Sequence, residues 1–179
     1  SEPSDGIWRI GISAVQTGDG EYHIWLPVQE FLEHSTYFLE ANPDNTITEP
    51  GNTPGTITTA FYNGKDNSVD INSGRGYTRG NHVKPDLATP GIQLTGAGLN
   101  GRFIQKSSSS GATGVVSGAA ALIMEWLLKR PESLTVSTSQ VANIMILGAG
   151  RKTLPEFPNQ EWGYGTLDVY QSLDRLRSL

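Results

Sequence analysis

The sequence predicts an α/β domain, because strand-like runs come first and helices with a three-to-four-residue apolar repeat come last. The run 56–62 is β-branched and aromatic, which is typical of a buried strand. Apolar residues recur at helical spacing in 111–127, and again at about 137–148 and 166–177. Strands followed by strand–helix alternation favour a sheet covered by helices.

Residues 7–26 predict a β-hairpin that lies outside this α/β part. The runs Ile7–Ile12 and Glu21–Leu26 both alternate between apolar and polar residues, and Thr17–Gly20 between them has good turn chemistry. A hairpin of this length is only marginally stable by itself. We therefore expect it to belong to a larger sheet.

The next stretches are expected to be irregular. Residues 35–55 are rich in Pro, Asn, Thr and Gly, and 63–83 holds four glycines among polar residues. A short strand is predicted at Ile92–Leu94, directly after a Pro-Gly pair.

The helix at 111–127 shows the strongest periodicity in the chain. Bulky apolar residues follow one stripe, and a second stripe carries only Gly111, Gly114, Gly118 and Ala121. A helix with one bulky and one very small face is usually buried against neighbouring backbone. The serine run Ser107–Ser110 precedes it, where a serine caps well.

Composition excludes several classes of function. The 179 residues carry a formal charge of −5 without a Lys/Arg run, which disfavours nucleic acid and anionic membranes as partners. There is no cysteine, so disulfides, thiolate zinc sites and cysteine nucleophiles are excluded. No uninterrupted run reaches the ~20 apolar residues that span a bilayer. The spacing of Asp19, Asp66 and Asp70 matches no calcium loop, so we expect no metal and no cofactor.

Three segments, in this order and spacing, resemble the subtilase family of serine proteases over about residues 56–179. The first is similar to the family's Lys-Pro-Asp…Pro-Gly segment, the second aligns without gaps on its nucleophile motif, and the third resembles the Gly-x-Gly turn before its last helix. They are Lys84-Pro85-Asp86-Leu87-Ala88-Thr89-Pro90-Gly91, Ser108-Ser109-Ser110-Gly111-Ala112-Thr113-Gly114-Val115-Val116-Ser117-Gly118-Ala119-Ala120-Ala121-Leu122, and Trp162-Gly163-Tyr164-Gly165-Thr166-Leu167-Asp168.

Further segments resemble the Csp germination proteases of clostridia, a group in which a jelly-roll domain is inserted in the catalytic domain. The segment 73–79, the run 46–51 and the hairpin ending in Trp25-Leu26-Pro27 carry this likeness. It implies that 1–27 is the end of an inserted jelly roll and that 28–179 is the C-terminal portion of a subtilisin-like parallel-sheet domain. It also implies a secreted or spore-associated bacterial protein, although the sequence itself leaves the compartment open.

The resemblance places Ser110 at the position of the catalytic nucleophile. Ser109 takes the family's Thr position beside it and would support the oxyanion. The family's Asp, His and oxyanion Asn are not recognisable, because His23, His34 and His82 all lack the family's context. We therefore expect these groups on an N-terminal part of the protease, which with its prosegment would be the chain's partner. The substrate would be a polypeptide, such as a spore cortex-lytic zymogen, and this chain alone would be inactive.

Other interpretations stay open at this stage. Ser108 and Gly114 stand where the family has Gly and Pro. Ser108 adds a side chain where backbone and substrate pack closely, which favours a catalytically inactive relative that senses or binds. Without its aligned flanks, Ser110 would be only a helix cap in a polar loop. An unrelated β-rich binding module is the third alternative.

Overall fold

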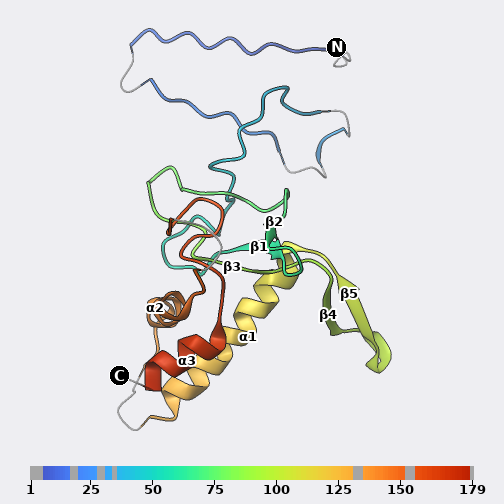
Figure 1. Ribbon diagram of the computed structural model, residues 1–179. Coiled ribbons are helices and arrows are strands. Elements are labelled where there is room, and N and C mark those ends of the chain that lie inside the picture. Colours follow the sequence, from blue (N-terminus) through green and yellow to red (C-terminus); the bar gives the residue numbers. More distant parts are fainter. Residues whose placement is uncertain are drawn as a thin grey trace. The chain divides into compact units, whose positions relative to one another are not determined.

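A computed structural model describes residues 6–16, 20–27, 31–33, 36–130, 135–151 and 156–177. The chain divides into two parts, Ser1–Ala41 and Asn42–Leu179. The second part holds the α/β architecture, as Figure 1 shows. Its elements are β1 (Thr59–Asn63), β2 (Ser68–Val69), β3 (Leu87–Pro90), β4 (Leu94–Ala97), the 3₁₀ turn η2 (Leu99–Gly101), β5 (Phe103–Lys106), α1 (Ser109–Leu128), α2 (Thr138–Gly148) and α3 (Val169–Arg177).

The main sheet has the order β2-β1-β3 and is parallel at its centre. β1 and β3 run in the same direction, in a register that pairs Thr59 with Leu87 and Tyr62 with Pro90. β2 joins the other edge of β1 in the antiparallel sense, and Thr166 extends the sheet beside Ala88 through a parallel bridge. The predicted α/β class with a parallel sheet is therefore confirmed.

Both faces of this sheet are covered, and β3 shows how. Leu87 is fully buried in a core made with residues of α1, α2 and α3. The next residue, Ala88, faces the other side and packs in a cluster with Tyr62 and Trp162. Successive side chains of a strand point to opposite faces, so β3 contributes to both cores at once. A parallel sheet requires this double cover.

The sequence located the helices better than the strands. α1 begins one residue before Ser110, and α2 coincides with the predicted 137–148. α3 starts at Val169, three residues later than predicted, and β1 ends one residue later than the predicted run. The predicted strand at 92–94 lies instead at β4, which pairs with β5 in a hairpin that the sequence did not indicate.

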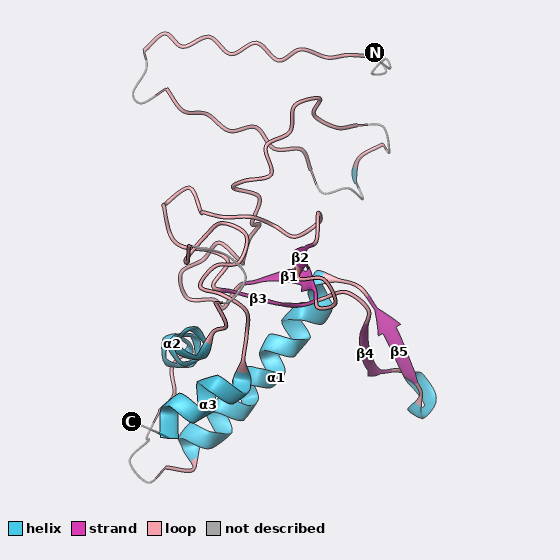
Figure 2. Ribbon diagram, viewed as in Figure 1, coloured by secondary structure: helices cyan, strands magenta, loops and turns pink. Residues whose placement is uncertain are grey.

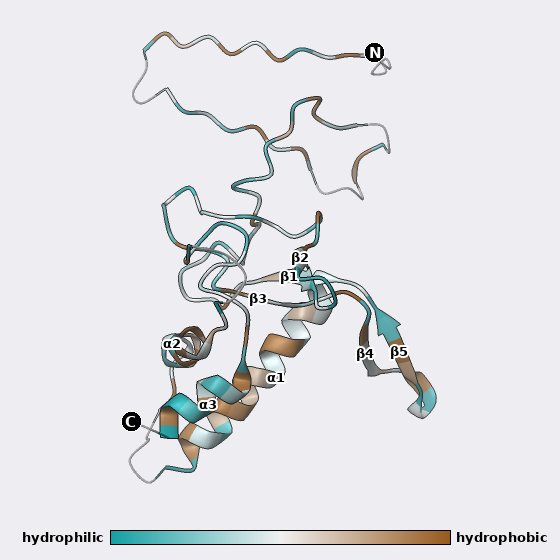
Figure 3. Ribbon diagram, viewed as in Figure 1, coloured by the Kyte–Doolittle hydropathy of each residue, from teal (hydrophilic) through white to brown (hydrophobic). Residues whose placement is uncertain are grey.

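α1 is buried along one stripe only, which corrects the expectation of a helix buried on both faces. Its buried residues are Ala112, Val116, Ala119 and Ile123. The small-residue face is open instead: a Cβ placed at Gly114 or Gly118 would meet nothing within 4 Å. Leu122 beside it is 53% exposed. Figure 3 shows apolar colour along α1, including parts that no neighbouring element covers.

α1 also has the length and composition of a membrane-spanning helix, contrary to the expectation from uninterrupted apolar runs. Its 20 residues reach a mean hydropathy of 1.5, because small residues separate the large apolar ones without adding charge. Of its most apolar stretch, 22% is buried inside the described structure. α1 contacts both β1 and β3, and its buried stripe is part of the core below the sheet.

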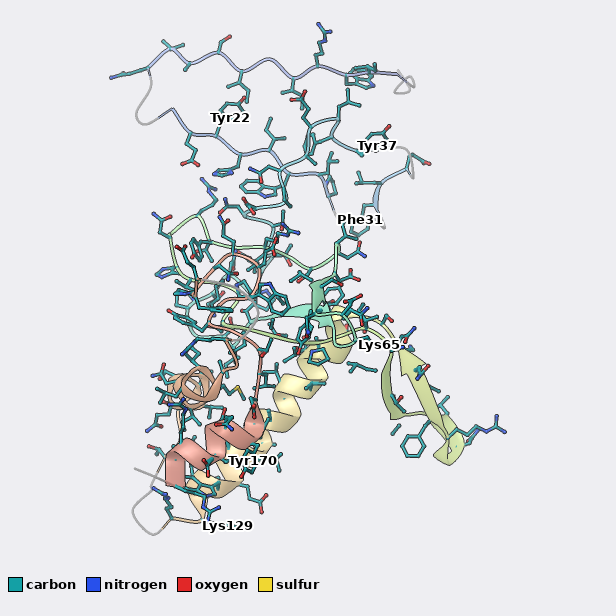
Figure 4. All side chains as sticks on the ribbon, in the orientation of Figure 1. Tyr22, Phe31, Tyr37, Lys65, Lys129 and Tyr170 are labelled. Carbon is teal, nitrogen blue, oxygen red and sulfur yellow. The ribbon has the colours of Figure 1, made fainter. Side chains whose placement is uncertain are left out.

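The predicted hairpin at 7–26 does not appear as strands. The described residues 6–16 and 20–27 are extended, and Figure 2 draws both stretches as loop. The predicted turn at 17–19 lies outside the described residues. Trp8 is 72% and Trp25 is 49% exposed, and the labelled Tyr22 is also exposed (Figure 4). A short two-stranded hairpin is only marginally stable by itself, so alternation alone does not ensure strand pairing.

The buried stripe of α1 gives the first testable prediction. Ile123→Ala removes a side chain that is 0% exposed from the core around Leu87. We expect it to lower the free energy of unfolding by about 2–5 kcal/mol, through lost burial and the cavity left behind. Urea unfolding of this chain, followed by tryptophan fluorescence, measures the change.

Leu122→Ala is the matched control, because its side chain is adjacent in sequence and 53% exposed. It should change the free energy of unfolding by less than ~0.5 kcal/mol. Equal losses in the two variants would contradict the described packing of α1.

Candidate active site

The serine run forms the N-terminus of α1. Ser108 is the N-cap, with extended backbone at φ −170° and ψ 154°, and its hydroxyl accepts a hydrogen bond from the N–H of Gly111 at 3.0 Å. Ser109 and Ser110 are the first two residues of the helix, and both are exposed. The residue that stands in place of the family's Gly therefore caps the helix that carries the candidate nucleophile.

The cap leaves the N–H groups of Ser109 and Ser110 available. The Ser108 hydroxyl accepts the N–H of Gly111, and the Ser108 carbonyl accepts the N–H of Ala112. Among the described residues, no hydrogen bond is recorded for the N–H of Ser109 or Ser110. The first N–H groups of a helix have no partner within the helix, and they lie at its positive dipole end. This end of α1 can therefore stabilise a negative oxygen beside the Ser110 hydroxyl.

The serine run is fixed to the end of β3. The N–H of Ser108 donates to the carbonyl of Gly91 at 2.9 Å, and the N–H of Gln93 donates to the hydroxyl of Ser107 at 2.9 Å. Gly91 has no room for a side chain, since a Cβ there would lie 2.6 Å from Cβ of Phe61. The close approach of β1 to the chain after β3 thus requires glycine at the point where α1 is attached.

The three motifs recognised in the sequence meet along β3. The N–H of Ala88 donates to the carbonyl of Gly165 at 2.9 Å, and the N–H of Leu167 donates back to the carbonyl of Ala88 at 2.9 Å. The N–H of Tyr164 donates to the carbonyl of Asp86, also at 2.9 Å. The Lys-Pro-Asp segment, the serine run and the Gly-x-Gly turn therefore form one hydrogen-bonded unit.

The side chains of the Lys-Pro-Asp segment make structural contacts within the fold. The Asp86 carboxylate accepts the N–H of Thr58 at 2.7 Å, and it pairs with the Nζ of Lys84 at 2.6 Å. The Lys84 side chain is only 3% exposed. The segment thereby ties the start of β1 to the start of β3.

A cavity of about 510 Å³ opens beside the serine run. Ser109 lines it from α1, while the loop before β1 supplies Thr46 to Gly51, and Thr58 and the segment 71–74 complete most of the wall. The lining joins stretches that are far apart in the sequence, so sequence reasoning did not find this cavity. Only the folded structure shows that Pro50 and Gly51 line the same cavity as Ser109.

The described residues place no base at Ser110. No recorded hydrogen bond joins the hydroxyl of Ser110 to a histidine in the described part of the chain. His23 stacks on Trp25 and lies 3.7 Å from Glu21, whereas His82 is an exposed residue of the loop closed by Thr78. His34 and Asp19 lie outside the described residues. Arg75 pairs with Glu161 at 2.6 Å.

The side chains whose pKa is clearly shifted lie outside the serine run. Burial raises the pKa of Tyr62, whose ring centroid lies 5.0 Å from that of Trp162 with the two rings tilted by 49°. A hydrogen bond from Ser68 lowers the pKa of the exposed Asp66, and Lys129 lowers that of Glu125 at the far end of α1. Within the described ranges, no group of three or more His, Asp or Glu side chains is arranged to hold a metal ion.

The serine run lies on the first turn of the helix that follows the parallel sheet, and the described structure records no hydrogen bond for the N–H groups of Ser109 and Ser110. The family model for the subtilases matches residues 19–165, so the chain belongs to the subtilase family. Subtilases are serine endopeptidases, and this chain is part of a subtilase protease domain.

Individual relatives agree with this assignment. The solved CspB protease of Clostridium perfringens is 31% identical, with a TM-score of 0.75, and the match covers 80% of this chain and 32% of that one. The membrane-bound transcription factor site-1 protease of mouse is 35% identical over 103 residues, which is 58% of this chain and 9% of the mouse protein. The self-cleaved protease domain of PatA, at 24% identity and a TM-score of 0.60, shares the fold. The chain thus spans about a third of CspB, and much less of the mouse relative.

The capping role of Ser108 can be tested directly. Ser108→Ala should lower the free energy of unfolding by ~1 kcal/mol, because the N–H of Gly111 loses its acceptor, whereas Ser108→Gly should cost only a few tenths. Ser109→Ala is the control, since no hydrogen bond of its hydroxyl is recorded in the described structure, and it should be neutral within ~0.5 kcal/mol. Urea unfolding measures all three, and a larger loss for Ser109→Ala than for Ser108→Ala would contradict the assigned cap.

Proposed function

We propose that this chain is the C-terminal segment of a subtilisin-like serine endopeptidase, with Ser110 as its nucleophile. The observation that carries the proposal is the exposed Ser110 on the first turn of α1, beside two free N–H groups and fixed to the end of β3. Its hydroxyl would attack the carbonyl carbon of a peptide bond and form an acyl-enzyme, which water then hydrolyses. The N–H of Ser110 would donate to the oxyanion, and Ser109 would support it from the adjacent position.

The remaining catalytic groups would come from an N-terminal part of the same protease. A serine hydroxyl is a weak nucleophile until a base removes its proton, and the described residues offer none at Ser110. In this family's order the Asp and His precede the Ser. The chain covers only 32% of the CspB protease. We propose that the Asp, the His, the oxyanion Asn and the prosegment belong to the part of the protease that this chain does not cover.

The open face of α1 supports this partner. Gly114 and Gly118 have nothing within 4 Å of a placed Cβ, and Leu122 beside them is half exposed. Small residues on a helix permit a close approach of another backbone, and a large exposed apolar patch marks an interaction surface. The N-terminal part of the protease would cover this face.

The likeness to CspB also carries the finer proposals. We propose a polypeptide substrate, a secreted or spore-associated location, and a jelly-roll origin for residues 1–27, with the catalytic portion at 28–179. The exposed aromatic side chains within 1–27, among them Tyr22, support a surface that packs on further strands (Figure 4). Neither nucleic acid nor a membrane is part of the proposal.

A catalytically inactive subtilase relative is the second candidate function. The observation that favours it is Ser108, which is a half-buried cap where the family has Gly. Ser108 would add a side chain two residues before the proposed nucleophile Ser110, where the family's Gly lets backbone and substrate pack closely. An inactive relative would keep the fold and the pocket and would act as a sensor or a binding subunit.

A fluorophosphonate probe that labels activated serines separates these functions. The chain alone should remain unlabelled, because loss of triad members leaves only about 10³–10⁴-fold catalysis over water. With the N-terminal part supplied, Ser110 should be labelled stoichiometrically, and Ser110→Ala should abolish the label. Mass spectrometry of the intact protein and its peptides gives the stoichiometry and the site.

Labelling of the chain alone would mean that a local base acts on Ser110, which contradicts the shared-site proposal. An unlabelled complete protease would contradict the proposed endopeptidase and favour the inactive relative. Ser108→Gly in the complete protein then tests the cause: a gain of labelling would assign the inactivity to that side chain.

Cover of the α1 face gives a second test. In the complete protease, Leu122→Ala should lower the free energy of unfolding by ~2–5 kcal/mol, because the side chain becomes part of a core. In this chain alone it should be nearly neutral, as it is 53% exposed. Ile123→Ala is the control that is costly in both. A neutral Leu122→Ala in the complete protease would show that the N-terminal part packs elsewhere.

A further inference from the structure

The wall of the cavity beside Ser109 is held from behind by Asp86. Thr58 lines the cavity together with Pro50 and Gly51. Its N–H donates to the Asp86 carboxylate at 2.7 Å, and its carbonyl accepts the N–H of Asp86 at 2.8 Å. These two hydrogen bonds, one donated and one accepted by the Thr58 backbone, fix the position of Thr58 against the start of β3.

Lys84 locks the same contact from the other side. Its Nζ donates to the Asp86 carboxylate at 2.6 Å and to the carbonyl of Thr56 at 2.6 Å. The Lys84 and Asp86 side chains are 3% and 14% exposed. A buried ion pair adds little net stability, because both charges lose their water. What it does supply here is a fixed position for Thr56 and Thr58.

This position is transmitted to the rim of the cavity. The hydroxyl of Thr58 donates to the carbonyl of Gly51 at 2.5 Å, and the hydroxyl of Thr56 donates to the carbonyl of Thr53 at 2.8 Å. The turn itself is closed by the N–H of Thr53, which donates to the carbonyl of Pro50 at 3.0 Å. A continuous path of hydrogen bonds therefore leads from a buried lysine to the turn that borders the serine run.

We propose that Lys84 and Asp86 are positioning residues, which hold the Pro50–Gly51 turn and Thr58 as a rigid wall for a substrate side chain bound beside Ser110. The inference rests on the proposed peptidase function and adds the part of the chain that sets substrate affinity. Loss of the pair should loosen the wall and leave the serine at the α1 N-terminus in place, because Ser108 is attached to Gly91 by a separate bond.

Two substitutions at Asp86 in the complete protease test this. Asp86→Leu removes the acceptor of the Thr58 N–H, and we expect a KM for a peptide substrate ~10-fold above wild type, since small misplacements near a site are costly. Asp86→Asn retains an oxygen that accepts from Thr58, so its KM should stay within about threefold. The rate of fluorophosphonate labelling at Ser110, which needs no side-chain pocket, should be unchanged in both.

Lys84→Met is the second variant if Asp86→Leu does not fold, because it keeps the Asp86 bond to Thr58 and frees only Thr56. It should raise KM without slowing the labelling of Ser110. Glu125→Gln is the matched control, as it breaks the exposed ion pair with Lys129 on α1 and should leave KM unchanged. An unchanged KM in the folded Asp86 and Lys84 variants would overturn the proposal. A rise in KM that is matched by an equal fall in the rate of Ser110 labelling would also overturn it, because such a result reports lost folding alone.

A failure of the proposed function is recognised separately. If the complete wild-type protein is not labelled, amide hydrogen exchange at Thr53 carries the test, because this N–H lies in the rim turn and does not contact Asp86. Faster exchange in Asp86→Leu, but not in Asp86→Asn, would support a wall held by the pair. Equal exchange in Asp86→Leu and wild type would overturn it.

Discussion

The hydrogen bonds of β3 are the constraint on which the rest of the structure depends. On one side β3 pairs with β1, and on the other its Ala88 exchanges bonds with the chain around Gly165 and Leu167. Its end, at Gly91, accepts the N–H of Ser108 and so sets where α1 begins. A serine at the start of a helix is common and has no function by itself. Ser110 becomes a candidate nucleophile because β3, which is hydrogen-bonded along both edges, fixes the start of α1 beside a cavity.

The same strand explains which parts of the fold the sequence predicted. The periodicity of 111–127 depends on residues that pack within this chain, such as Ile123 below Leu87, and α1 appears within two residues of the prediction. Periodicity does not tell which neighbour covers a helix face. The sequence therefore did not predict that the α1 face with Gly114 and Gly118 is open in the described structure. The alternation at 7–26 forms no strand in the described part, since a short hairpin is only marginally stable by itself.

The position of Ser110 at the start of a helix was predictable, whereas its surroundings were not. The aligned flanks placed Ser110 on the first turn of the helix, where the structure has it. The capping bond from Ser108 to Gly111 follows from a conformation that a serine run does not specify in advance. The cavity joins Ser109 to Thr58 and the turn at Pro50, which are separated by long loops, and no local pattern encodes that meeting.

A crystal structure of the complete protease tests most directly the claim that β3 presents Ser110 as a nucleophile. We expect the Ser108 to Gly91 bond to be retained and a histidine from outside this chain to lie within ~3.2 Å of the Ser110 hydroxyl. We also expect the N–H of Ser110 to face the same space as that hydroxyl. An N-terminal part that covers Ser110 with apolar side chains, or an α1 that begins elsewhere and leaves Gly91 unbonded, would contradict it.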